Sequence, residues 1–145
     1  MVLLAAAALV ALTAACGGEH AARTGSGTAG PEPPVTGTDW RIVRIATHTG
    51  TDHPDGTAHL GIDATTGKAG GRLGCNHFSA TATVRDGRIT LGSPTTTRMM
   101  CDASLMRTER TLLDVFNSAL TYRVEHHTLT LTCANGTIIQ AVARK

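Results

Sequence analysis

Short runs of alternating apolar and polar residues, separated by tight-turn signals, fill most of the chain after Trp40. Three of these runs are 58–63, 78–84 and 128–132. Alternation with a period of two places successive side chains on opposite faces of a strand, so one face of each run can be buried. Asp86-Gly87 and Asn135-Gly136 are dipeptides favoured in two-residue hairpin turns. The pattern predicts a mainly β (α+β) fold in which an antiparallel meander curls into a barrel-like sheet.

One stretch has the periodicity of a helix instead. Over residues 104–120 the apolar side chains recur at three- and four-residue spacing, which predicts one amphipathic helix. Asp102 or Ser104 is suited to cap its N-terminus. Glu109 falls close to the middle of the apolar stripe. Because an unpaired buried charge is very costly, we expect Glu109 to be paired, to be protonated or to face a cavity.

The beginning of the chain has the character of an export signal. Residues 1–15 are almost purely apolar, and they are shorter than the roughly 20 residues that a membrane-spanning helix needs. Cys16 follows Ala15 and precedes two glycines, which resembles the lipidation motif of bacterial lipoproteins. Thr13 stands where a branched apolar residue is usual, and no Lys or Arg precedes Arg23. We expect export with a lipid on Cys16, with secretion without a lipid as the alternative.

Composition divides the chain into three parts. Residues 1–16 are the signal peptide with its lipobox-like cysteine, 17–38 are a tether, and 39–145 are one folded domain. The tether is rich in Gly, Thr and Pro, so it cannot bury enough apolar surface to order itself. Behind a lipidated cysteine, such a tether would hold the domain clear of the membrane surface.

Two short segments and the helix with Glu109 carry a family resemblance. The segments are 74–79 (GCNHFS) and 96–101 (TTRMMC). Together they resemble the META domain family, which includes HslJ-like bacterial lipoproteins, and the resemblance covers about residues 40–143. It implies an incomplete, cracked barrel packed around one helix. It also implies an envelope role linked to stress tolerance, with no established enzymatic activity. His77 and Ala80 are mild departures from the usual residues of the family.

The resemblance also implies a disulfide between Cys75 and Cys101, because both lie inside the signature segments. A loop of that length would stabilise the domain by roughly 3.5 kcal/mol in the chain-entropy model. Cys133 ends an alternating run and is expected to be a buried apolar residue, with pairing to Cys75 or Cys101 as the alternative. The sequence contains no C-x-x-C motif and no closely spaced cysteines, so it indicates neither a redox enzyme nor a zinc site.

For Glu109 we expect a structural ion pair with Arg98, whose planar guanidinium matches a carboxylate. The functional alternative is a general acid or a ligand-binding carboxylate at the mouth of the barrel. The seven histidines fit no metal-ligand spacing, and no nucleophile motif such as G-x-S-x-G is present. We therefore expect no enzymatic activity, no cofactor and no metal.

The overall charge of +2 and the absence of a basic run argue against nucleic-acid binding. The main hypothesis is a monomeric, lipid-anchored and non-enzymatic module of the cell envelope that binds an unknown envelope protein or supports stress tolerance. The alternative is a carrier that holds a small apolar ligand in the barrel mouth.

Overall fold

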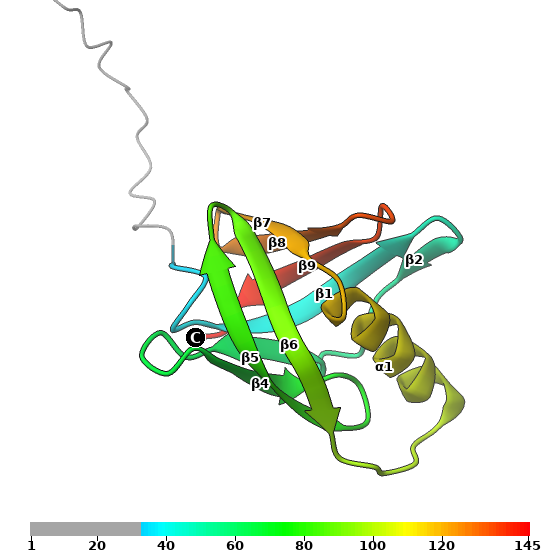
Figure 1. The fold of residues 1–145 in the computed structure, drawn as a ribbon. Helices are drawn as coiled ribbons and strands as arrows, with labels where there is room; N and C mark the ends of the chain where they lie inside the picture. The colour runs from blue at the N-terminus through cyan, green and yellow to red at the C-terminus, as the bar shows by residue number, and fades with distance from the viewer. Residues whose placement is uncertain (1–32) are drawn as a thin grey trace, which may run out of the picture.

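Nine antiparallel strands and one helix make up residues 33–145, the part of the chain that the computed structural model describes (Figure 1). Their order is β1 (Asp39–Thr47), β2 (Gly50–Asp52), β3 (His59–Ile62), β4 (Lys68–Arg72), β5 (His77–Arg85), β6 (Arg88–Thr96), α1 (Ala103–Phe116), β7 (Leu120–Glu125), β8 (Thr128–Cys133) and β9 (Ile138–Ala143). The three alternating runs all form strands, so the prediction of a mainly β fold is confirmed.

Eight of the strands close into a barrel, because β1 pairs with β3 on one side and with β9 on the other. The remaining strand, β2, pairs only with the end of β1. The expectation of an incomplete, cracked barrel is therefore wrong. The nine residues of β1 are long enough to bridge both edges of the meander, and a register shift between Ile42 and Arg44 lets the strand bend. The shortest pairing is β6–β7, with the two pairs Arg88–Thr121 and Ile89–Leu120.

The barrel interior is filled by its own side chains. The largest fully buried ones come from six of the strands, from Leu73 after β4 and from α1: Trp40, Ile42, Ile45, Leu60, Leu73, Ile89, Leu112, Phe116, Leu120, Leu129, Leu131 and Ile139. Phe78 and Phe116 lie with their ring centroids 5.4 Å apart, so the helix contributes an aromatic contact to the core.

Helix α1 begins directly after its N-cap residue, Asp102. The side chain of Asp102 accepts hydrogen bonds from the backbone N–H groups of Ser104 and Leu105 at 3.1 Å each. The hydrogen bond from the Ser104 hydroxyl, together with these backbone bonds, holds the pKa of Asp102 below its usual range. The helix ends at Phe116, and Leu120, which sequence periodicity placed in the helix, begins β7 and is buried in the barrel.

The residues just before β1 already pack against the barrel. Val35 is buried, the Trp40 indole N–H donates to the Val35 carbonyl at 3.0 Å, and the Gly37 N–H donates to the Ile62 carbonyl at 2.7 Å. The last residues that we assigned to the tether thus contact the barrel. The predicted signal peptide and Cys16 lie outside the described residues. Within residues 33–145, no helix is long and apolar enough to cross a membrane.

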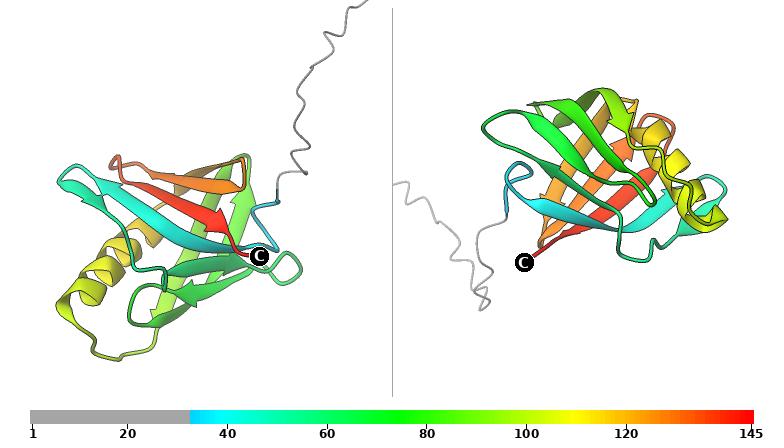
Figure 2. Two further views of the ribbon diagram at one scale, coloured as in Figure 1. Left: turned by 180° about the vertical axis from the view of Figure 1, so that it is seen from behind. Right: turned by 90° about the horizontal axis from the view of Figure 1, so that it is seen from below.

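The two ends of the barrel carry different features. At one end lie the start of the described chain, the C-terminus and the β5–β6 turn, and the ion pair of Asp39 with Arg144 (3.0 Å) joins the two termini there. At the other end lie α1 and the β1–β2 hairpin (Figures 1 and 2).

Candidate functional site

The META-like signature residues meet around the side chain of Asn76. Its Nδ2 donates to Glu109 Oε1 at 2.8 Å and to the carbonyl of Met99 at 3.1 Å. Its Oδ1 accepts from the Met99 N–H at 2.6 Å and from the Thr97 hydroxyl at 3.0 Å. Asn76 therefore joins three separate elements: the turn between β4 and β5, the loop between β6 and α1, and the helix itself.

Glu109 completes this cluster from the helix. Its Oε2 accepts from the backbone N–H of Asn76 at 2.6 Å, so both carboxylate oxygens are hydrogen-bonded to one residue. Both residues are buried, Glu109 at 5% and Asn76 at 2% exposure. Of the three outcomes expected for Glu109, the structure shows a hydrogen-bonded partner, and the bonds from Asn76 replace the water that burial removes.

The predicted partner of Glu109 is wrong. Arg98 is exposed, and the salt bridges among residues 33–145 are Arg123–Glu125 and Arg144–Asp39. Arg98 lies in the β6–α1 loop between Thr97 and Met99. The side chain of Thr97 and the backbone of Met99 are hydrogen-bonded to Asn76. That arrangement brings the loop backbone to the buried cluster and leaves the arginine side chain in solvent. An amide satisfies the carboxylate without burying a second charge.

Cys75 and Cys101 form a disulfide, as the resemblance implied, with their Cα atoms 5.8 Å apart. Beside it, Gly74 packs directly on α1. A Cβ atom at Gly74 would lie 2.7 Å from the carbonyl oxygen of Leu105, which is closer than real Cβ contacts. The glycine of the Gly-Cys-Asn segment thus allows the helix backbone to approach, and the disulfide fixes the loop that precedes the helix.

Cys133 is a free, buried cysteine at 4% exposure, as expected for an apolar strand residue. The alternative in which it pairs with Cys75 or Cys101 is wrong. In the described part of the chain, no group of three His, Cys, Asp or Glu side chains is placed to hold a metal ion.

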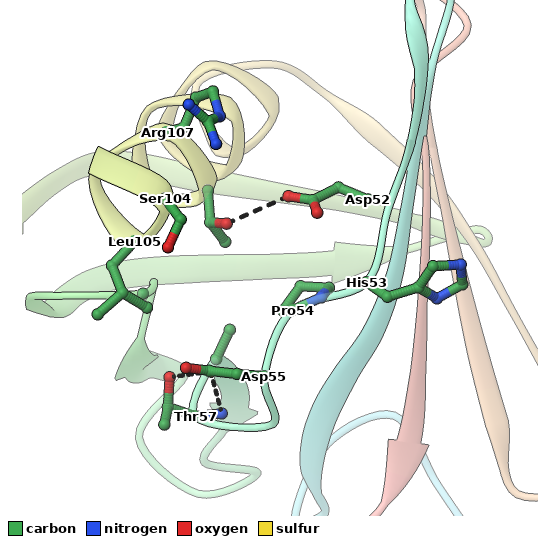
Figure 3. Close-up of a pocket in the computed structure, with 11 residues that line it drawn as sticks. Asp52, His53, Pro54, Asp55, Thr57, Ser104, Leu105 and Arg107 are labelled. Atoms are coloured by element: carbon green, nitrogen blue, oxygen red, sulfur yellow. Dashed lines mark hydrogen bonds between the residues drawn. The ribbon is translucent and has the colours of Figure 1, made fainter. Parts of the chain in front are cut away.

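A small cleft lies between the first turn of α1 and the connection from β2 to β3 (Figure 3). It holds about 130 Å³, well below the ~300 Å³ at which pockets for small-molecule ligands begin. The Thr108 hydroxyl donates to Asp52 across it at 3.3 Å, and Asp55 binds its own loop through Thr57. The cleft is a polar contact between helix and loop that leaves room only for water or a very small solute.

Sequence reasoning missed the residue at the centre of the site. Asn76 was noted only as part of the signature segment, whereas the structure makes it the partner of Glu109. The one available signal was the carboxylate in an apolar stripe, which required a buried partner somewhere in the signature.

The comparisons with known proteins concern the family and the fold. The model of the META domain matches residues 33–145. No curated protein matches the chain. An NMR structure of a protein from Burkholderia xenovorans is similar at a TM-score of 0.63 with 20% identity, over 83% of this chain and 95% of that one. A crystal structure of a DUF4847 family protein from Bacteroides vulgatus is similar at 0.56 with 15% identity, over 77% and 95%.

At these identities the two solved structures show the fold alone. The family match, in contrast, spans the whole described region, including the disulfide, Asn76 and Glu109. The chain belongs to the META domain family.

Proposed function

We propose that this protein is a non-enzymatic binding module of the cell envelope, exported and held to the membrane by a lipid on Cys16. The observation that carries the proposal is that its buried polar cluster is closed on itself. Asn76 occupies both oxygens of Glu109, so this carboxylate has no free oxygen directed at a substrate or a ligand. Interaction with a partner is then left to the outer surface.

The residues lining the small cleft also support a non-enzymatic role. Asp52, His53 and Ser104 all line it, which is the residue set of a hydrolase, but they do not converge. The Ser104 hydroxyl donates to Asp102 at 2.6 Å as part of the helix cap. The His53 ring points away from Ser104 (Figure 3), and its Nδ1 lies 3.2 Å from the carbonyl oxygen of Val43. A general base would have to contact the nucleophile.

The alternative of a small-ligand carrier receives little support. A carrier needs an empty apolar interior, whereas twelve large side chains fill this barrel with less than 2% of their surface exposed. The expected carrier carboxylate, Glu109, is closed onto Asn76.

The place where the chain enters the barrel fits a tethered protein. The described chain begins at the end of the barrel opposite α1 (Figure 1), so an anchor upstream would attach to the domain at the end away from the helix. Exposed Met99 and Met100, at 49% and 86%, lie in the loop that leads to this helix. They are the large hydrophobic side chains that residues 33–145 expose most, and methionine adapts well to varied partner surfaces.

The test is intact mass of the protein from membrane and soluble fractions of a bacterial host, beside a Cys16→Ser variant. We expect the wild type in the membrane fraction with a mature N-terminus at Cys16 carrying acyl mass, and the variant without it. Native mass spectrometry of the same sample checks the binding role. A stoichiometric small apolar adduct would favour the carrier, and an unacylated wild type would remove the anchor.

A further inference from the structure

Four basic side chains form one row across strands β1, β3, β4 and β5. Arg41 on β1 lies opposite His59 on β3, and His59 in turn lies opposite Arg72 on β4. Arg72 lies opposite His77 on β5. The residues that alternate with them, such as Leu60, belong to the core, so the row lies on the outer face of the barrel. Directly opposed side chains have Cβ atoms about 5 Å apart, so each histidine of this Arg–His row adjoins an arginine.

The arginines of the row have no counterion within the described part of the chain. The salt bridges of residues 33–145 include neither Arg41 nor Arg72. Arg72 is half-buried, and its Nε atom is buried with no hydrogen-bond partner among these residues. The next charged side chain on the same face of β4 is Lys68, a further cation. Because burial removes water that would screen the guanidinium, its charge acts more strongly on the neighbouring strands.

The carboxylates near the row are engaged elsewhere. Asp39 lies on the same face of β1, diagonal to His59, and forms its ion pair with Arg144 at 3.0 Å. Asp55 lies in the loop between β2 and β3, where it accepts from the backbone N–H and the hydroxyl of Thr57 at 3.2 and 2.8 Å. Neither carboxylate is within salt-bridge distance of a member of the row.

The two ends of the row add no negative charge. On β9, the residue opposite Arg41 is Val142. On the side of β6, the Thr97 N–H donates to the carbonyl of His77 at 3.0 Å, and the next residue, Arg98, is another exposed cation. The row is therefore surrounded by uncharged residues, by cations and by carboxylates that already have partners.

Acid adds charge to this row. Histidine is the side chain that ordinarily changes its charge between roughly pH 5 and 8. The Nδ1 atom of His59 lies 3.1 Å from the carbonyl oxygen of Thr57. Because a carbonyl oxygen only accepts, Nδ1 carries a hydrogen and the proton added in acid goes to Nε2. With both histidines protonated, each cross-strand contact of the row joins two like charges, which is destabilising.

We propose that the Arg–His row makes this wall of the barrel sensitive to acid, because protonation of His59 and His77 weakens the pairing of β3 and β4 with their neighbours. The repulsion exists in the folded chain and is largely absent from the unfolded one, so the folded state takes up these protons less readily. Stability is then complete at neutral pH and falls as the pH falls. The wall is susceptible because β3 and β4 share four registered pairs, and glycines occupy both positions of the pair Gly61–Gly70. This property does not depend on the proposed binding role.

The experiment is urea unfolding of the full chain at pH 7.5 and at pH 5.5, followed by the fluorescence of Trp40. That residue is buried and lies opposite Leu60 in the same wall. The test variants are His59→Gln, which removes the titrating group, and Arg72→Gln, which keeps both histidines. The control is His48→Gln, in the turn between β1 and β2, where no residue is paired opposite it.

We expect the folded-to-unfolded ratio of the wild type to fall between the two pH values by about fivefold more than that of His59→Gln. Arg72→Gln should reduce the fall to a similar extent, although it removes no histidine. Salt at about 1 M should also reduce the difference between the wild type and His59→Gln, because it screens exposed charges. His48→Gln should fall as steeply as the wild type.

Three results would overturn the proposal: a fall in His59→Gln equal to that of the wild type, an Arg72→Gln variant as acid-sensitive as the wild type, or a His48→Gln variant that reduces the fall as much as His59→Gln. If half-buried His59 does not tolerate replacement, His77→Gln takes its place. That position is exposed and opposes one arginine, so the expected difference is about twofold, and no difference would again refute the proposal.

Discussion

Replacing Asn76 by Ala should destabilise the protein more than any other single change in the signature cluster. The side chain makes four hydrogen bonds, two through Nδ2 and two through Oδ1, to Glu109, Met99 and Thr97. A bond to a charged group contributes ~1.5–3 kcal/mol and a neutral bond about 1 kcal/mol. The substitution also leaves a buried carboxylate with a single donor, the N–H of residue 76. The one charged bond and the three neutral bonds sum to about 5 kcal/mol, at the upper end of the ~3–5 kcal/mol measured when one partner of a buried pair is removed.

The assay is urea unfolding followed by the fluorescence of Trp40, which is the chain's single tryptophan and is fully buried. When the same fluorescence is followed on heating, the expected loss lowers the melting temperature of a domain of this size by roughly 20 °C. The matched control is Arg98→Met, an exposed neighbour that should change stability by less than about 0.5 kcal/mol. A loss below about 1 kcal/mol for Asn76→Ala, or an Arg98→Met variant as unstable as Asn76→Ala, would refute the assignment of Asn76 as the partner of Glu109.

A second test of that pairing is Asn76→Leu combined with Glu109→Leu, whose loss should be smaller than the sum of the single losses in a double-mutant cycle on the same unfolding assay. Gly74→Ala should destabilise by at least about 1 kcal/mol because its Cβ would meet a helix carbonyl at 2.7 Å, whereas Gly92→Ala, with 3.6 Å of room, should not. Reducing the Cys75–Cys101 disulfide should cost roughly 3.5 kcal/mol, seen as a lower urea midpoint with reductant, and reductant should have no effect on a variant with both cysteines changed to Ser. The lowered pKa of Asp102 means that its contribution is present above the unfolded value of 3.8 and is lost as pH falls through the folded pKa. Asp102→Ala should therefore show a shallower loss of stability below about pH 4, and an unchanged pH profile would contradict the capping role.

Local pattern was sufficient for much of the architecture. Period-two alternation and the dipeptides at 86–87 and 135–136 placed the strands and hairpins, since both signals depend only on neighbouring residues. The helix start followed from the cap at Asp102, and Glu109 was recognised as a buried carboxylate that needs a partner. These features are determined by the sequence itself, because side-chain alternation in a strand and hydrogen bonding at a helix cap depend only on the residue types at neighbouring positions.

Barrel closure and the partner of Glu109 were decided only by the tertiary structure. Closure depends on β1 pairing with β9, roughly a hundred residues later in the chain, and no local signal reports such a contact. Asn76 and Arg98 both belong to the signature segments, and the packing of Gly74 on α1 places the amide of Asn76 against Glu109 and leaves the guanidinium of Arg98 in solvent. The sequence could require that the charge be paired, whereas the choice of donor depended on which backbone could approach the helix.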